Sequence, residues 1–338
     1  MVIREKRGYR MRKVKWGVLG TAGIAKGQTI PGMKEAENCE LYAIAGRSLE
    51  KATAFQTEFG FEKAYGSYEE LLQDEEVEAV YIPLPNTMHY EWTVKALEAK
   101  KHVLCEKPLA PSEEIVRKMI EIAEKNGVLL MEAFAYLHSP FTKAIKQEIE
   151  NKTIGDVVYM ESTFVTSDYD ISNIRMRRET LGGCLYDLGC YNTTQILWML
   201  EEEPEKLQAM SDFSEEKIDV YTTAIMNFKS GKRAVLNCGM VLDTETPERF
   251  DRIDNFRIHG TKGSIRSEVQ FNQCGELSYI VSIGGKEEVK VIDTPQNYCL
   301  EVEQFGRCIL EGEKLHVSHE FTLKNARLMD RILETIHY

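Results

Sequence analysis

Apolar runs alternate with amphipathic stretches through the first part of the chain. The stretch at residues 113–125 has the period of a helix, because Ile115, Met119 and Ile122 fall on one face, and Asn126-Gly127 supplies a C-terminal stop. Strands separated by helices of similar length predict an α/β fold with a parallel, doubly wound sheet. The apolar runs predict strands at residues 14–20, 41–45, 77–84, 102–105 and 128–134. The amphipathic stretches predict helices from residue 24 and at residues 49–59, 90–99 and 113–125.

After about residue 150 the pattern changes to strand-like runs joined by tight turns. Residues 217–228 and 233–242 are joined by Lys229-Ser230-Gly231-Lys232, which is a hairpin signal. A second hairpin is predicted around Gly284-Gly285, between residues 279–283 and 288–292. Such strands predict an α+β unit on an antiparallel sheet, which can leave one face open for a partner. Helices are predicted at residues 185–200, 298–310 and 318–336.

The change of pattern divides the 338 residues into two domains behind a short basic extension. We expect the extension at residues 1–13, a first domain at 14–135 and a second domain at 136–338, whose last helix could pack back on the first. Residues 1–15 hold seven Lys and Arg residues against Glu5 alone. A frayed leader is favoured over a contact tail, because most chain termini are poorly ordered.

Composition and charge exclude several classes of protein. Acidic residues outnumber basic ones by 54 to 42, and the net charge of -12 opposes an extended nucleic-acid or anionic-membrane surface. No apolar run reaches the length of about 18 residues needed to span a membrane, and the basic leader lacks the apolar segment of a secretory signal. The eight cysteines form no Cys-x-x-Cys pair, and the histidines lack the spacing of metal ligands. We expect a cytoplasmic protein with reduced thiols, no metal and a small-molecule partner.

The first candidate motif is Gly20-Thr21-Ala22-Gly23-Ile24-Ala25, where the first strand gives way to a helix. A dinucleotide site needs glycine for a tight turn, a small residue where the pyrophosphate approaches, and a small residue where the helix packs on the sheet. The first glycine is present, and Ala22 and Ala25 occupy the other two places. Small residues are common at any turn from a strand to a helix, so the motif favours a dinucleotide-binding domain only together with the strand–turn–helix pattern around it.

The end of the second strand indicates which dinucleotide is preferred. An acid there would bind the ribose 2′-hydroxyl of NAD, whereas a cation would bind the 2′-phosphate of NADP. The sequence offers Ala45-Gly46-Arg47-Ser48, without an acid. Arg47 could pair with a phosphate, and Ser48 could cap the next helix while donating a hydrogen bond. NADP(H) is therefore favoured, and NAD(H) remains the alternative.

Two further motifs lie just beyond strand C-terminal ends, where open α/β sheets bind ligands. One is Pro83-Leu84-Pro85-Asn86 with His89, and the other is Cys105-Glu106-Lys107-Pro108. The proline after Lys107 restricts the backbone φ and ψ angles of the lysine, so that its side chain projects in a defined direction. A single lysine is usually a solvated surface charge, but a lysine between an apolar strand and a proline is a stronger candidate.

These motifs resemble those of a known family. Asn86…His89, Glu106-Lys107-Pro108, Glu132-Ala133-Phe134 and the run from Gly182 to Tyr191 occur in the order and spacing of the glucose–fructose oxidoreductase and inositol dehydrogenase family (Gfo/Idh/MocA). The branch is similar to the dimeric dihydrodiol dehydrogenases and xylose dehydrogenases. The resemblance implies a Rossmann domain, then a domain on an open, mostly antiparallel sheet that also forms a homodimer. It implies hydride transfer between a nicotinamide and a sugar, cyclic polyol or dihydrodiol.

The resemblance also implies the roles of three residues. Lys107 matches the family's catalytic lysine, and Asp187 and Tyr191 match its acid and the partner four residues on. Oxidation of a secondary alcohol needs a base for the hydroxyl proton. Tyr191 could exchange that proton if the Lys107 ammonium lowers its pKa, or Lys107 could hold the hydroxyl itself while Asp187 fixes the lysine. Without the resemblance, Asp187 and Tyr191 would be taken as a helix-terminal acid and a half-buried aromatic.

The predicted site combines these motifs. The residues expected at the cofactor are Gly20, Thr21, Ala22, Gly23, Ile24, Ala25, Arg47, Ser48, Pro83, Leu84, Pro85, Asn86, His89, Glu106 and Lys107. The residues expected at the substrate are Glu132, Tyr136, Arg175, Asp187 and Tyr191. Arg177 and Arg178 could favour an acidic or phosphorylated substrate, but a solvated basic loop is the favoured interpretation.

The sequence thus predicts a cytosolic, NADP-preferring oxidoreductase that acts on CH–OH groups. One alternative is a catalytically silent NAD(P)-binding sensor of the same fold. The presence of Lys107, Asp187 and Tyr191 argues against a sensor, because a sensor needs only the phosphate loop. A third possibility is an oxidoreductase that keeps its nicotinamide bound and cycles between two substrates.

Overall fold

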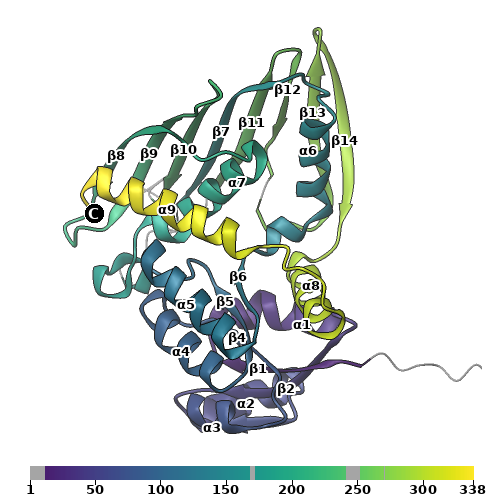
Figure 1. The fold of residues 1–338 in the computed structure, drawn as a ribbon, viewed down its shortest axis with the longest axis vertical. Helices are drawn as coiled ribbons and strands as arrows, with labels where there is room; N and C mark the ends of the chain where they lie inside the picture. The colour runs from purple at the N-terminus through teal and green to yellow at the C-terminus, as the bar shows by residue number, and fades with distance from the viewer. Residues whose placement is uncertain (1–11, 168–171, 241–251, 270) are drawn as a thin grey trace, which may run out of the picture.

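The computed structural model describes residues 12–167, 172–240, 252–269 and 271–338. Most of the predicted basic extension lies outside the described residues. The described chain builds two sheets stacked end to end, with the C-terminal helices running along both (Figure 1).

The first sheet has six parallel strands in the order β3-β2-β1-β4-β5-β6. The order is that of doubly wound dinucleotide-binding sheets, and it places the switch point between β1 and β4. The strands are β1 (Val14–Leu19), β2 (Cys39–Ala45), β3 (Lys63–Tyr65), β4 (Ala79–Ile82), β5 (His102–Glu106) and β6 (Leu130–Ala133). The helices are α1 (Ile30–Glu35), α2 (Leu49–Phe59), α3 (Tyr68–Gln73), α4 (Asn86–Glu98) and α5 (Glu113–Asn126), with a π-helical turn (Ala25–Thr29) before α1. The pattern predicted this parallel arrangement, although it missed β3 and α3.

Helices cover both faces of this sheet. The apolar side chains of α3, α4 and α5 pack on one face, where Leu71, Trp92 and Met119 are buried. On the other face α1 lies beside α8 (Asn297–Glu311), and Trp16 of β1 contacts Phe305 of α8 with ring centroids 5.6 Å apart. The central strands are mainly apolar because both of their faces are covered.

The second sheet has eight strands in the order β14-β13-β12-β11-β7-β10-β9-β8. All neighbours are antiparallel except β7 and β10. The strands are β7 (Val157–Thr166), β8 (Lys206–Phe213), β9 (Asp219–Asn227), β10 (Arg233–Gly239), β11 (Arg252–Gly260), β12 (Gly263–Ser267), β13 (Gly275–Ile283) and β14 (Lys286–Thr294). Together the two sheets confirm the predicted fold class, and both predicted hairpins form, as β9–β10 and β13–β14. Residues 241–242 of the strand predicted at 233–242 lie outside the described residues.

One face of the second sheet carries helices and the other does not in Figure 1. The covering helices are α6 (Pro140–Glu150), α7 (Cys190–Leu200) and α9 (His319–Ile336). Met160, Leu236 and Phe256 point into this layer and are buried. The opposite face exposes apolar side chains such as Met210 and Ile225, which are 81% and 51% exposed. This face is the open one that the sequence predicted.

The last two helices tie the two sheets together. From α9, Arg327 forms ion pairs with Glu113 at the start of α5 (2.8 Å) and with Glu203 of the second domain (2.7 Å). The Glu113 backbone N–H also donates to Asp330 of α9 (2.8 Å). The C-terminal helix therefore lies on the first domain as well as on the second sheet.

Candidate active site

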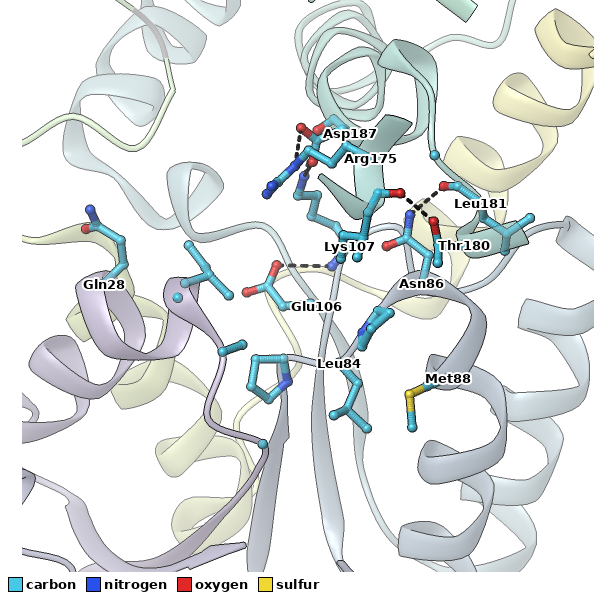
Figure 2. A pocket seen from close by; sticks show the side chains of 18 of the residues that line it. Gln28, Leu84, Asn86, Met88, Glu106, Lys107, Arg175, Thr180, Leu181 and Asp187 are labelled. Carbon is cyan, nitrogen blue, oxygen red and sulfur yellow. Dashed lines mark hydrogen bonds and ion pairs between the residues drawn. The ribbon is translucent and has the colours of Figure 1, made fainter. Parts of the chain in front are cut away.

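A cleft of about 1150 Å³ opens between the domains, at the carboxyl ends of the first sheet's strands (Figure 2). This is the position at which open α/β sheets bind ligands. Most of the predicted residues line it, from both domains. They are Gly20, Thr21, Ala22, Gly23, Ile24, Arg47, Ser48, Pro83, Leu84, Pro85, Asn86, Glu106, Lys107, Arg175, Asp187 and Tyr191.

The turn after β1 fits a dinucleotide pyrophosphate. Gly20 has a φ of +129°, which L side chains rarely adopt, and an added Cβ would lie 3.0 Å from Leu84 Cδ2. At Gly23 an added Cβ would meet nothing within 4 Å, so the backbone here faces open space at the start of the helical segment. Ala25 does not line the cleft, because it is buried in the core beneath the turn, where a small residue lets the helix approach the sheet.

The part of the cleft at the end of β2, where the sequence predicts the cofactor ribose, is lined by cationic side chains and is called the ribose end. Arg47 and Ser48 line it as predicted, and the Ser48 hydroxyl caps α2 by accepting from the Lys51 backbone N–H (3.4 Å). Lys51 lines the same end and was missed by the sequence analysis, although its place in the first turn of the capped helix was visible. Among the described lining residues, the acids are Glu106 and Asp187, which belong to the other end.

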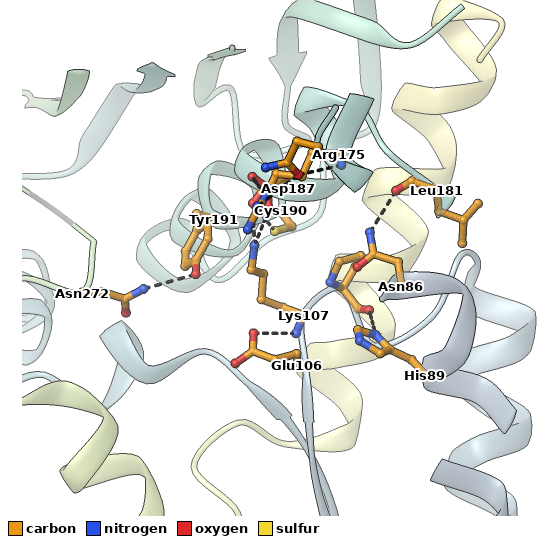
Figure 3. Close-up of polar contacts among 12 residues, drawn as sticks. Asn86, His89, Glu106, Lys107, Arg175, Leu181, Asp187, Cys190, Tyr191 and Asn272 are labelled. Carbon is orange, nitrogen blue, oxygen red and sulfur yellow. Dashed lines mark hydrogen bonds and ion pairs between the residues drawn. The ribbon is translucent and has the colours of Figure 1, made fainter. Parts of the chain in front are cut away.

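The Lys107 ammonium is held by Asp187 at the junction of the domains (Figure 3). Lys107 Nζ donates to the Asp187 backbone oxygen (2.6 Å) and lies 3.2 Å from Oδ1, while Arg175 Nε lies 2.8 Å from Oδ2. Burial alone would lower the pKa of Lys107, but Asp187, together with smaller contributions from Cys190 and Glu106, outweighs it and the pKa is raised. Burial likewise opposes ionisation of Asp187, yet its two cationic neighbours hold its pKa below the ordinary value. The pair is therefore a charged lysine on an ionised aspartate.

Tyr191 presents its ring to the lysine. Lys107 Nζ lies 4.7 Å from the ring centroid, and the Tyr191 hydroxyl accepts from Asn272 Nδ2 (3.2 Å). Burial raises the pKa of Tyr191 well above its ordinary value. The lowering of this pKa that the sequence analysis considered is not found, because the ammonium contacts the face of the ring and the ring lies among Phe164, Phe271 and Tyr136.

Glu106 forms the floor of the cleft beside Lys107. Its Oε1 accepts from the Tyr81 hydroxyl (2.5 Å), which itself accepts from Thr29 Oγ1 (2.8 Å). The Lys107 backbone N–H donates to Oε2 (3.3 Å). Burial raises the pKa of Glu106. These bonds fix the carboxyl group and the backbone from which Lys107 projects.

Three other predicted residues lie behind the cleft rather than in it. His89 is buried, with its ring nitrogens 2.8 Å from the carbonyl oxygens of Leu84 and Pro108, so it joins the two loops that carry Asn86 and Lys107. Glu132 accepts from the Leu109 backbone N–H (2.9 Å) beside a small separate cavity. Tyr136 is buried against Thr194, at 2.9 Å from its Oγ1. These side chains support the site without lining it.

The second domain also supplies lining residues that the sequence analysis missed. They come from β7, β11, the segment before β13 and the start of α8. They are Phe164, Arg252, Phe271, Asn272, Gln273 and Tyr298. No local motif marks them, because they converge on Tyr191 only when the eight-stranded sheet has formed.

Comparison with known proteins settles the family. Residues 14–134 match the model of an oxidoreductase family with an NAD-binding Rossmann fold, and residues 142–266 match the Gfo/Idh/MocA C-terminal domain. The chain belongs to the Gfo/Idh/MocA family. The predicted family and oxidoreductase class are thereby confirmed.

Relatives of the chain share its full length. It is 33% identical to a D-xylose 1-dehydrogenase (NADP(+)) of Haloferax volcanii, over 95% of this chain and 96% of that protein. It is 31% identical to a trans-1,2-dihydrobenzene-1,2-diol dehydrogenase of Xenopus laevis, over 95% and 98%. The structure is similar to that of a 3-ketoreductase from Actinomadura kijaniata in complex with NADP and TDP-benzene, with a TM-score of 0.89, 27% identity and coverage of 96% and 98%. These relatives match the branch that the sequence resembled.

Two further findings concern the described residues alone. They contain no group of three or more His, Cys, Asp or Glu side chains that could hold a metal ion. Nor does any of their helices combine the length and apolar character needed to cross a membrane.

Proposed function

We propose that this member of the Gfo/Idh/MocA family is an NADP(H)-dependent dehydrogenase or reductase that interconverts a secondary hydroxyl and a carbonyl of a sugar, cyclic polyol or dihydrodiol. The observation that carries the proposal is the Lys107–Asp187 pair, which faces Tyr191 inside a cleft whose other end fits a dinucleotide. The relatives' names, a xylose dehydrogenase and a dihydrodiol dehydrogenase, support the substrate class.

The chemistry follows from the protonation of Lys107. A bound nicotinamide supplies the donor or acceptor of the hydride. Lys107 Nζ carries the proton that a carbonyl oxygen needs on reduction, and its neutral form takes that proton back on oxidation. Asp187 orients the ammonium and keeps it protonated, while the Tyr191 hydroxyl, held by Asn272, binds the same substrate oxygen. We assign proton exchange to Lys107 rather than Tyr191, because Tyr191 holds its own proton tightly.

The preference for NADP(H) rests on the ribose end. We assign Arg47, Ser48 and Lys51 to the 2′-phosphate, because this end of the cleft offers two cations and a hydroxyl. A fluorescence titration with NADPH and NADH side by side tests this. NADPH should bind at least about tenfold more tightly, and Arg47→Ala should remove most of that difference. Equal binding of NADH, or a preference for it, would overturn the assignment.

The open face of the second sheet is assigned to a homodimer. It carries exposed Met210 and Ile225 on adjacent strands and Val289 and Val291 on β14. The two pairs lie at opposite edges of the same face, so this face exposes apolar side chains at both of its edges. Exposed apolar groups on an uncovered sheet face are typical of an association surface. We also assign the protein to the cytoplasm, since all eight cysteines are free and six of them are buried.

The activity itself is tested by initial rates with NADP⁺ and NADPH over a panel of pentoses, hexoses, inositols and dihydrodiols. Turnover of at least one member supports the proposal. A protein that binds NADPH but turns over none of them would favour the alternative, a silent sensor. Cofactor that survives purification would favour an enzyme that cycles between two substrates with its nicotinamide bound.

A further inference from the structure

The substrate end of the cleft brings three cationic side chains together. Lys107, Arg175 and Arg252 line it, in a protein whose net charge is -12. Lys107 and Arg175 share the single carboxylate of Asp187. Arg252 has Asp254 behind it, and Glu106 lies beside Lys107, where its carboxyl group accepts from Tyr81 and from the Lys107 backbone N–H. Arg252 thus belongs to a different ion pair from Lys107 and Arg175, and it brings a cation of its own to this end of the cleft.

Arg252 is held in one orientation at the wall of the cleft. Its guanidinium lies over the Phe164 ring, 4.6 Å from the centroid, and Nη2 pairs with Asp254 and also donates to the Phe271 backbone oxygen (3.4 Å). An arginine fixed on an aromatic face loses little further entropy when it binds a planar anion. Arg252 is thus positioned by the protein before any substrate arrives.

The fixed arginine keeps donors for a ligand. Within the described residues, neither Nε nor Nη1 of Arg252 has a hydrogen-bond acceptor, and the side chain is 30% exposed toward the cleft. Burial lowers the pKa of the guanidinium, which shows that its environment does not fully compensate the charge. A second charge-assisted bond at this edge would supply that compensation.

The position of Arg252 relates it to the reacting group. Phe164, on which it stacks, packs edge-on against the Tyr191 ring with centroids 5.8 Å apart. Lys107 lies on the same Tyr191 ring. One small substrate could therefore present its reacting oxygen to Lys107 and a second substituent to Arg252.

We propose that Arg252 binds an anionic substituent, a carboxylate or a phosphate, on the substrate, so that the enzyme acts on an acidic or phosphorylated sugar or polyol in preference to its neutral parent. The inference rests on the proposed function, since it names the substrate class of the same site. The arginines that the sequence singled out do not serve this purpose. Arg177 pairs with Glu179 on the surface, and Arg178 stacks on Tyr338, outside the cleft.

Matched substrates test the proposal. Initial rates are measured with NADP⁺ for D-glucose, D-glucuronate and D-glucose 6-phosphate, and for myo-inositol and its monophosphate. The enzyme should favour an anionic member over its neutral parent by at least tenfold in kcat/KM, and the carboxylate and phosphate arms show which anion is preferred. Arg252→Met should reduce that ratio about 10–100-fold, chiefly through KM, and Arg252→Lys should keep part of it. Arg177→Met is the matched control and should leave the ratio unchanged.

Ligand binding provides a second measurement that does not depend on turnover. The unfolding temperature of the NADPH complex is measured with each neutral and anionic ligand, for the wild type and for Arg252→Gln, which preserves hydrogen bonding if Arg252→Met fails to fold. Anionic ligands should raise it more than neutral ones, and only when Arg252 is present. Equal shifts for neutral and anionic ligands, or a preference that survives Arg252→Met, would overturn the proposal. Loss of NADPH binding or of all turnover would instead count against the proposed function.

Discussion

At the scale of single residues, the mechanism depends on which group holds the exchangeable proton. Lys107 and Tyr191 both retain their protons at neutral pH, but for different reasons. Asp187 raises the pKa of Lys107 through its charge, whereas Tyr191 is protonated because its ring and hydroxyl are buried. Only the first of these can be altered by changing one neighbouring charge, which makes Asp187 the informative position.

Asp187→Asn should shift the pH dependence of turnover toward lower pH, both for oxidation of the alcohol and for reduction of the carbonyl. Oxidation needs neutral Lys107, so its rate rises as pH passes the pKa of the lysine; reduction needs the ammonium, so its rate falls there. Loss of the Asp187 charge lowers that pKa, so the rise in the oxidation rate and the fall in the reduction rate both move to lower pH. The loss of orientation should also reduce kcat, on the order of 10–100-fold. Profiles of kcat/KM against pH in both directions measure the shift.

Glu179→Gln is the control for Asp187→Asn. Glu179 is an exposed carboxylate in the short helix Arg178–Thr180, before the turn that carries Asp187, and it pairs only with Arg177 among the described residues. The pH profiles of Glu179→Gln should therefore match those of the wild type. If the pH profiles of Asp187→Asn were unchanged, or shifted to higher pH, Lys107 would not be the group whose titration controls the rate.

At the scale of elements, the segment before α7 fixes Asp187. The Asp219 carboxylate accepts from the Leu185 backbone N–H (2.8 Å) at the start of the π-helical turn Leu185–Gly189. Gly183 has a φ of +107°, and an added Cβ there would lie 1.8 Å from Asp219 Oδ1. The close approach of Gly183 to Asp219 therefore sets where the turn begins and where Asp187 points.

Gly183→Ala should damage both stability and turnover. The methyl group displaces Asp219 and adds backbone strain, so we expect a loss of ~1–3 kcal/mol in the free energy of unfolding, together with a clear fall in kcat. Gly231→Ala separates the two causes, because Gly231 has a similar φ of +90° in a surface hairpin with nothing within 4 Å. Urea unfolding and steady-state kinetics on both variants decide the matter. If the two variants lost kcat equally, the contact with Asp219 would have no role in catalysis.

The sequence predicted strands best where the fold buries both faces of the strand. Both faces of the first sheet are covered, so its strands read as apolar runs, and their ends locate Lys107 and Asn86. In the second sheet one face is open, and polar residues interrupt strands such as β8 and β11, which the pattern missed. Arg252 and Asn272 were missed for a related reason: their neighbours in the cleft come from distant strands, and no local spacing records that. The raised pKa of Tyr191 was also beyond the sequence, since it depends chiefly on how deeply the folded chain buries the ring and its hydroxyl.

At the scale of the whole molecule, the open sheet face predicts a dimer. Ile225→Glu should give a monomer by sedimentation or light scattering, because a buried charge without a partner costs several kcal/mol at an interface. The variant should still bind NADPH, since Ile225 lies on β9 of the second sheet and is not among the residues that line the cleft. Val158→Glu is the matched control: Val158 is comparably exposed but shares the strand parity of buried Met160, on the helix-covered side. A monomeric wild type, or an Ile225→Glu dimer, would contradict this assembly.

The two domains work as one catalyst only if the first domain's lysine acts on a substrate held by the second. Lys107→Met tests this most directly, because it removes the ammonium while leaving the phosphate turn and the ribose end unchanged. For Lys107→Met we expect an NADPH dissociation constant within about threefold of the wild type and a turnover that falls by about 10²–10⁴-fold, whereas Tyr191→Phe should keep most of its kcat and lose chiefly in KM. Turnover that persists in Lys107→Met, or that is abolished in Tyr191→Phe, would contradict the assignment of the proton to Lys107.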